Sequence, residues 1–230
     1  LVLPVPIGSY GNISMISAPA KTKKTFFVSL LTSAYLSGDN PYCGQIKGHR
    51  AERSVLHIDT EQGRWHSHRT FQNTFNVSRI NDSKKYHTFG LRSIGWKNRL
   101  PFIEYCLERY QDVGLLCIDG VADLILDPNN QEQSNECAEK LMQISEKYNC
   151  HIITVIHSNY GTDKARGHLG TSLMNKIETE IRLEKNTTNP SWVTVHCKMS
   201  RGYPFETFNF EVNKEGYPEV VSELYDPLAN

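Results

Sequence analysis

Two patterns of hydrophobic and polar positions alternate along the chain. Short apolar runs rich in β-branched residues predict strands, and apolar residues recurring every three or four positions predict helices. Strands are expected at residues 12–17, 54–59, 86–91, 113–119, 150–157, 181–185, 192–198 and 205–212. Helices are expected at residues 25–36, 65–75, 97–110 and 130–148, with a short one at 171–178, and residues from 217 onward read as a surface segment.

This order of elements predicts an α/β fold. Strands that alternate with helices form a mostly parallel central sheet flanked by helices, built from right-handed crossovers. The last strands are joined by short polar turns such as NTTNP, which predicts antiparallel strands at the C-terminal edge. No repeat or linker divides the chain, so we expect one domain over residues 1–230, with its core at about 8–212.

Composition narrows the class of protein. The 25 basic and 25 acidic residues balance, so no overall positive field marks a nucleic-acid-binding protein. No apolar run approaches the roughly 18–20 residues of a membrane span, and the first residues lack the features of a signal peptide, resembling instead a short lead-in or the cut end of a longer protein. The six cysteines contain no C-x-x-C pair. We therefore expect a cytoplasmic protein with reduced cysteines and no membrane partner.

The segment Ser14–Thr25, SMISAPAKTKKT, carries the clearest candidate chemistry. A strand, a short loop and Lys24-Thr25 opening a helix follow the layout of the phosphate-binding loop G-x-x-x-x-G-K-[ST], although Ala18 and Lys23 stand in place of its glycines. Three nearby lysines at a helix N-terminus are unfavourable unless an anion compensates them. The alternative is a solvated basic turn.

If the loop binds a nucleotide, Lys24 is expected to contact the β- and γ-phosphates and Thr25 to place its hydroxyl on Mg²⁺. The nucleotide-binding candidates are the nine consecutive residues Ala18, Pro19, Ala20, Lys21, Thr22, Lys23, Lys24, Thr25 and Phe26.

Four further groups of polar residues follow predicted strands. Asp119 can hold Mg²⁺ beside the phosphates, and Glu61 can polarise the attacking water. His157 can sense the γ-phosphate or bond to the catalytic carboxylate, and Lys198 and Arg201 can reach an anion. Each also has an ordinary structural reading, as a solvated carboxylate, a structural hydrogen-bonding histidine or hairpin charges. His57, within its strand, reads as structural.

Taken in order, these segments resemble the RecA-like P-loop ATPases, nearest the branch of hexameric plasmid replication helicases, DnaB-type motors and related ATPases of plasmids and mobile elements. The resemblance covers roughly residues 8–212 and includes GNISMISAPAKTKKTFF, SVLHIDTEQ, VGLLCIDGVADLI, IITVIHSN and CKMSRGYPFETFNFEV. It implies a catalytic glutamate at Glu61, a Walker B aspartate at Asp119, a sensor at His157, and a basic finger at Lys198 and Arg201.

The resemblance also implies partners. In such rings, which can be hexameric, the finger contacts the nucleotide of a neighbouring subunit. The segment YGTDKARGHLGTS, which matches a pore-facing loop of the family, carries Lys164, Arg166 and His168 as candidate DNA contacts. ATP and Mg²⁺ are the implied cofactors. The role is ATP hydrolysis coupled to replication, mobilisation or transfer of a plasmid or mobile element, with helicase activity not implied.

The departures from the family pattern keep a second function open. Glycine before the lysine normally relieves crowding near the phosphates, and a lysine there can reshape the anion-binding backbone. Two residues separate Lys198 from Arg201, where helicase versions usually have one. The alternative is a degenerate nucleotide-binding or non-hydrolysing module that acts in assembly or DNA binding. A kinase-type phosphotransferase lacks a recognisable acceptor site or lid.

Overall fold

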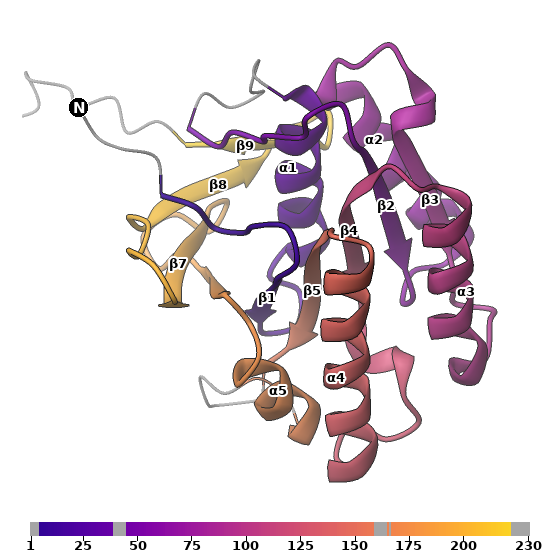
Figure 1. The fold of residues 1–230 in the computed structure, drawn as a ribbon. Helices are drawn as coiled ribbons and strands as arrows, with labels where there is room; N and C mark the ends of the chain where they lie inside the picture. Colours follow the sequence, from indigo (N-terminus) through magenta and orange to yellow (C-terminus); the bar gives the residue numbers. More distant parts are fainter. Residues whose placement is uncertain (1–4, 39–44, 159–164, 166, 222–230) are drawn as a thin grey trace, which may run out of the picture.

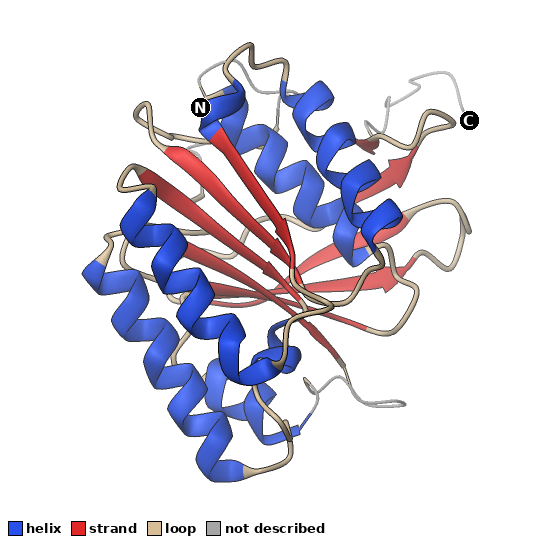
Figure 2. Ribbon diagram, turned by 90° about the vertical axis from the view of Figure 1, so that its right-hand side faces the viewer, coloured by secondary structure: helices blue, strands red, loops and turns tan. Residues whose placement is uncertain are grey.

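The structure is a computed structural model, and it describes residues 5–38, 45–158, 165 and 167–221. It contains a nine-stranded sheet with helices on both faces (Figures 1 and 2). The strands are β1 (Ile13–Ala18), β2 (Ser54–Asp59), β3 (Tyr86–Gly90), β4 (Val113–Asp119), β5 (His151–His157), β6 (Thr179–Lys185), β7 (Val193–Ser200), β8 (Phe208–Val212) and β9 (Pro218–Val220). The helices are α1 (Lys24–Ser37), α2 (Arg64–Ser78), α3 (Trp96–Arg109), α4 (Gln131–Lys147) and α5 (Gly167–Met174), with 3₁₀ turns at Ser83–Lys85 and Val121–Leu124.

The strand order β3-β2-β4-β5-β1-β6-β7-β8-β9 confirms the α/β fold expected from the sequence. Strands β3 to β6 in this order are parallel. Strands β6 to β9 are antiparallel and form the C-terminal edge. The carboxyl ends of β1, β2, β4 and β5 therefore meet at one edge of the sheet, where ligands bind in open α/β sheets.

Two hydrophobic clusters fix the sheet between its helical layers. Helices α1 and α2 pack on one face around Phe27, Leu30 and Phe71. Helices α3, α4 and α5 pack on the other face around Ile103, Leu141 and other residues of the second cluster. Strands β1, β2 and β4 are buried along their whole length, which explains why their sequences are nearly continuous apolar runs rather than alternating ones.

Several expected elements need correction at their ends. The short helix expected at 171–178 lies at Gly167–Met174, and β6 begins at Thr179 instead of 181. Strand β8 begins at Phe208, since residues 203–207 form no strand. Residues 218–220, expected in a surface segment, form the edge strand β9 against β8. A three-residue strand that begins with proline has too little alternation to be recognised in sequence.

Four free cysteines and His57 lie in the interior of the fold. Cys106, Cys117, Cys137 and Cys150 are free and buried in the sheet and its helical layers, whereas Cys43 lies outside the described residues. His57 is fully buried and shares a 2.8 Å hydrogen bond with the Tyr86 hydroxyl, as a structural histidine does. None of the helices in the described part of the chain has the length and apolar character needed to cross a bilayer.

Candidate functional site

The loop between β1 and α1 adopts left-handed backbone conformations without glycine. Lys23, at the position before α1, has φ 55° and ψ 31°, and Lys21 has φ 59°. A left-handed conformation costs an L-residue on the order of 1–2 kcal/mol, so the surrounding contacts must hold it in place. The buried Thr22 hydroxyl donates to the Pro19 carbonyl oxygen at 2.8 Å. The loop thus keeps a compact turn ahead of the free N–H groups of α1.

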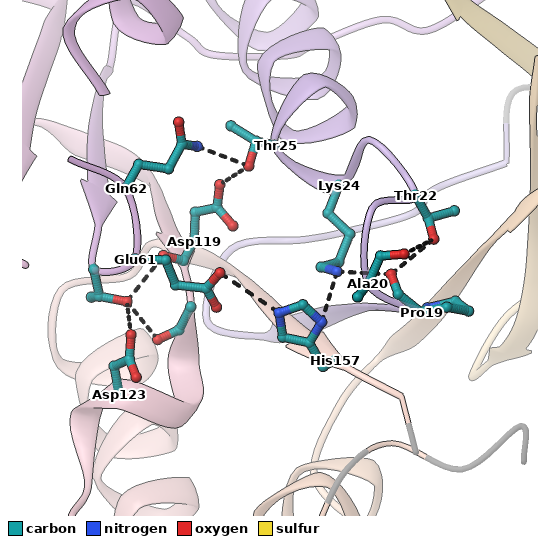
Figure 3. Close-up of polar contacts among 12 residues, drawn as sticks. Pro19, Ala20, Thr22, Lys24, Thr25, Glu61, Gln62, Asp119, Asp123 and His157 are labelled. Atoms are coloured by element: carbon teal, nitrogen blue, oxygen red, sulfur yellow. Dashed lines mark hydrogen bonds and ion pairs between the residues drawn. The ribbon is translucent and has the colours of Figure 1, made fainter. Parts of the chain in front are cut away.

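The two lysines at the end of this loop point to different places. The Lys23 ammonium donates to the Ser191 carbonyl oxygen at 2.8 Å, so its charge lies beside the β6–β7 connection. The Lys24 ammonium is buried and donates to the Pro19 carbonyl oxygen and to His157 Nδ1, each at 3.0 Å (Figure 3). Burial lowers the pKa of Lys24, and the nearby Glu61 and Asp119 carboxylates oppose that effect.

A second group joins the start of α1 to the end of β4. The Thr25 hydroxyl donates to Asp119 Oδ2 at 2.6 Å, and the Gln62 amide donates to Thr25 Oγ1 at 3.1 Å (Figure 3). The pKa of Asp119 is raised to about 7, mainly because the side chain is buried. The nearby Asp59 and Glu61 carboxylates also raise this pKa, whereas the hydrogen bond from Thr25 lowers it. A cation beside Asp119 would stabilise its charged form.

The oxygen atoms of Thr25 and Asp119 fit Mg²⁺, which prefers hard oxygen ligands. Among the described residues, no group of three or more His, Cys, Asp or Glu side chains could hold a metal ion. The protein therefore offers one carboxylate and one hydroxyl, not a complete cage. This is the pattern of sites in which Mg²⁺ keeps waters and shares phosphate oxygens with the substrate.

His157 bridges Lys24 and the candidate catalytic glutamate. An ammonium group only donates, so His157 Nδ1 must accept from Lys24, and the ring carries its proton on Nε2. His157 Nε2 lies 3.6 Å from Glu61 Oε2. The interaction with His157 is the main cause that lowers the pKa of Glu61, and Lys24 adds to it. Glu61 is thereby held as a carboxylate, the form that a general base requires.

Asp59 sets the position of Glu61, and the sequence did not reveal this role. Asp59 Oδ1 accepts from the backbone N–H groups of Glu61 and Gln62 at 3.0 and 2.9 Å, and Oδ2 accepts from the Ser67 hydroxyl at 2.6 Å. The side chain of Asp59 is buried. The available signal was the D-T-E spacing, which places a carboxylate two residues before Glu61, where it can bond its own backbone.

Thr60 ties the same connection to the end of β4. Its hydroxyl lies 2.8 Å from the Gly120 carbonyl oxygen and 3.0 Å from Asp123 Oδ2. A Cβ atom on Gly120 would lie 2.3 Å from Thr60 Oγ1, and φ at Gly120 is 104°. Glycine is therefore required at this position for the two connections to approach each other.

The candidate finger and pore residues lie elsewhere. Lys198, near the end of β7, lies 3.4 Å from the fully buried Glu180, whose Oε1 also accepts from the Ser17 hydroxyl. Arg201 follows β7 and donates to the Lys176 carbonyl oxygen at 3.3 Å. His168 lies in the first turn of α5, whereas Lys164 and Arg166 fall outside the described residues. The structure thus gathers Lys24, Thr25, Glu61, Asp119 and His157, with the finger pair on a separate edge.

Comparison with known proteins places the chain in a family. A family model described as an AAA domain matches residues 8–163, which is more than half of the chain. The chain belongs to this AAA domain family. Its fold is similar to the crystal structure of the RadB recombinase, with a TM-score of 0.65 and 16% identity over 94% of this chain and 93% of the other. No curated protein matches the chain in sequence.

The chain is thus a member of the AAA domain family with a fold similar to that of the RadB recombinase. The loop 18–26 departs from the phosphate-binding pattern G-x-x-x-x-G-K-[ST] in having Ala18 and Lys23 where that pattern has glycines. The left-handed backbone at Lys23 shows how the chain keeps the turn without the usual residue.

Proposed function

We propose that the protein binds ATP with Mg²⁺ in the loop 18–26 and hydrolyses it. The observation that carries the proposal is the continuous contact chain from Lys24 through His157 to Glu61, beside the Thr25–Asp119 pair (Figure 3). These residues supply the three functions that phosphoryl transfer needs: a cation for the phosphates, ligands for Mg²⁺ and a carboxylate for the attacking water.

Each side chain has a distinct task in this proposal. Lys24 exchanges its contacts with Pro19 and His157 for a phosphate oxygen. Glu61 accepts a proton from the attacking water, and His157, whose Nε2 lies 3.6 Å from Glu61 Oε2, orients that carboxylate. Thr25 and Asp119 would hold Mg²⁺, which would supply positive charge to neutralise the phosphates.

Turnover of ATP by wild type and three variants tests this assignment. Lys24→Ala is expected to lose both ATP binding and turnover, because the phosphates lose their buried cation. Glu61→Gln is expected to bind ATP and to turn over at least about 100-fold more slowly, the usual range for loss of a general base. Lys147→Ala, a change of an exposed lysine on α4, is the matched control and should match wild type.

Equal turnover in wild type, Lys24→Ala and Glu61→Gln would overturn the catalytic proposal. Tight binding of ATP by wild type without turnover would support the alternative function, a non-hydrolysing nucleotide-binding module in assembly or DNA binding. The motive for that alternative is the glycine-free loop, in which both Lys23 and Lys24 already have protein partners.

We further propose that the chain is a single domain and assembles into a homo-oligomeric ring, which can be a hexamer. This ring acts in the replication or transfer of a plasmid or mobile element. The support is the resemblance of its segments to that branch of the RecA-like ATPases, together with a basic pair at the far end of β7. In such a ring Arg201 of one subunit would complete the site of the next. Arg201→Ala should then lower turnover without weakening ATP binding, and light scattering should show more than one subunit.

A further inference from the structure

The positive charge of the chain is concentrated in one stretch. Residues 62–103 hold eight lysine and arginine residues and a single acidic residue, Asp82, although the whole chain has 25 of each sign. The eight are Arg64, Arg69, Arg79, Lys84, Lys85, Arg92, Lys97 and Arg99. A local excess of this size in a neutral protein indicates a surface that attracts anions.

The fold brings the first and last parts of this stretch together beside the nucleotide site. Strands β2 and β3 are parallel neighbours, with Asp59 opposite Gly90, so α2 and the β3–α3 connection start at the same edge of the sheet (Figure 1). The Arg92 guanidinium lies against Gly63, within 3.4 Å of the place of a Cβ atom there. Both connections therefore share one surface.

Most cations of this surface lack an acidic partner. In the part of the chain that the structure describes, no carboxylate lies within ion-pair distance of Arg64, Arg92 or Lys97, and all three side chains are exposed. Arg99, by contrast, donates to the Asp123 carbonyl oxygen at 2.6 Å and lies 3.8 Å from its carboxylate. Among the described residues, therefore, no salt bridge explains why these three cations lie close together.

Aromatic rings are interleaved with these cations. The Trp65 side chain is 64% exposed, and the Arg69 guanidinium lies 5.5 Å from its ring centre. Trp96 has the Lys97 ammonium at the same distance. The exposed indole of Trp65 and the half-buried indole of Trp96 lie among cations without an acidic partner. This is the composition of surfaces that bind single-stranded nucleic acid, because bases stack on the rings while cations contact the phosphates.

We propose that this basic–aromatic surface, formed by Arg64, Trp65, Arg69, Arg92, Trp96 and Lys97, binds single-stranded nucleic acid. It is distinct from the loop at 160–172 and does not depend on ATP hydrolysis. Trp65 provides a stacking platform, and the cations track the phosphates. Because Arg64 lies only three residues after Glu61, a bound strand would contact the same connection that carries the candidate general base.

A second copy of the chain is the competing occupant. The first turns of α4 carry an acidic hollow lined by Gln131, Glu132, Asn135, Glu136 and Glu139. Its charge complements the basic–aromatic surface, and such head-to-tail contacts build rings or filaments. This hollow is lined by carboxylates and amides, so it offers no apolar seat for the exposed indole of Trp65. Nucleic acid matches both the charge and the rings.

Binding of a labelled oligothymidylate of about 16 nucleotides by the full chain, followed by fluorescence anisotropy, tests the proposal. The double variant Arg64→Glu/Lys97→Glu should bind at least about tenfold more weakly, because phosphate contacts are replaced by repulsion. Trp65→Ala should also weaken binding about tenfold and lose part of the tryptophan quenching that accompanies stacking. Lys147→Glu and Tyr105→Ala, which change an exposed cation and a 60% exposed ring on other surfaces, are the matched controls.

Circular dichroism confirms that each variant is folded before binding is compared. Equal affinity of wild type and both surface variants, or no binding by wild type, would overturn the proposal. A change of subunit number in Arg64→Glu/Lys97→Glu that Glu132→Lys/Glu136→Lys restores would also overturn it, by showing that the surface joins two copies.

Discussion

Two charged regions lie next to each other at the carboxyl edge of the sheet, and they differ in whether their charged groups have partners within the protein. In the candidate nucleotide site, Lys24, Glu61 and Asp119 each contact a partner within the protein. On the basic–aromatic surface, Arg64, Arg92 and Lys97 have no such carboxylate among the described residues. Because the charged groups of the first region already contact protein partners, a ligand must replace those contacts with its own. Unpaired exposed cations can accept a polyanion with little rearrangement.

The connection between β2 and α2 joins the two regions. It begins at the buried Asp59, carries Glu61 and Gln62 on the nucleotide side, and continues into Arg64 and Trp65. Since both regions depend on this connection, substitutions within it should affect them together. Substitutions outside it should separate them.

The largest expected effect comes from Asp59→Ala. The change leaves two backbone N–H groups and the Ser67 hydroxyl without their buried acceptor, which should lower the free energy of unfolding by about 3 kcal/mol. ATP turnover should fall at the same time because Glu61 loses its position. Urea unfolding and a turnover assay measure both effects.

Asp82→Ala is the matched control for this substitution, because Asp82 is exposed and accepts one local backbone hydrogen bond. It should cost no more than about 1 kcal/mol. If Asp59→Ala unfolds at the same urea concentration as wild type and keeps its turnover, the connection does not hold the site in the way inferred here.

The second-largest expected effect is on the salt dependence of nucleic-acid binding, which should distinguish the two regions. With three or four phosphate contacts, the affinity for single-stranded nucleic acid should fall roughly 20- to 50-fold between 50 and 200 mM salt. Arg64→Glu/Lys97→Glu should show a much shallower dependence, and Lys24→Ala should keep the wild-type slope because Lys24 is buried in the other region. An unchanged slope in the double variant would place the phosphate contacts elsewhere.

The smallest effect concerns the backbone at Lys23. Lys23→Gly and Lys23→Ala both lose the contact with Ser191, but only glycine adopts the left-handed conformation without a steric penalty. The glycine variant should therefore be more stable than the alanine variant by about 1 kcal/mol. Chemical denaturation of the two variants side by side measures the difference, and a more stable alanine variant would contradict the loop conformation.

Much of the fold was predictable because the buried strands β1, β2, β4 and β5 are mostly apolar and polar residues follow or end them. The convergence of Lys24, Glu61, Asp119 and His157 follows, since parallel strands end at the same edge. The bonds made by Asp59 depend on how the β2–α2 connection folds back, which spacing alone does not specify. The ends of α5 and the strand β9 depend on tertiary contacts with little local pattern.

The same limit applies to the lysines. Lys23 and Lys24 are adjacent in sequence, and nothing in their pattern separates a lysine that contacts Ser191 from one that contacts His157. The left-handed backbone at Lys23 directs the two side chains apart. The balanced net charge of the whole chain likewise gives no sign of the basic–aromatic surface, because it hides a local excess of positive charge.

Isothermal titration of wild type and Lys24→Ala with ATP and Mg²⁺ measures whether the glycine-free loop binds the phosphates of ATP. We expect saturable binding by wild type that depends on Mg²⁺, and binding too weak to measure by a folded Lys24→Ala variant. Absence of binding by wild type, or equal affinity in the two proteins, would contradict it.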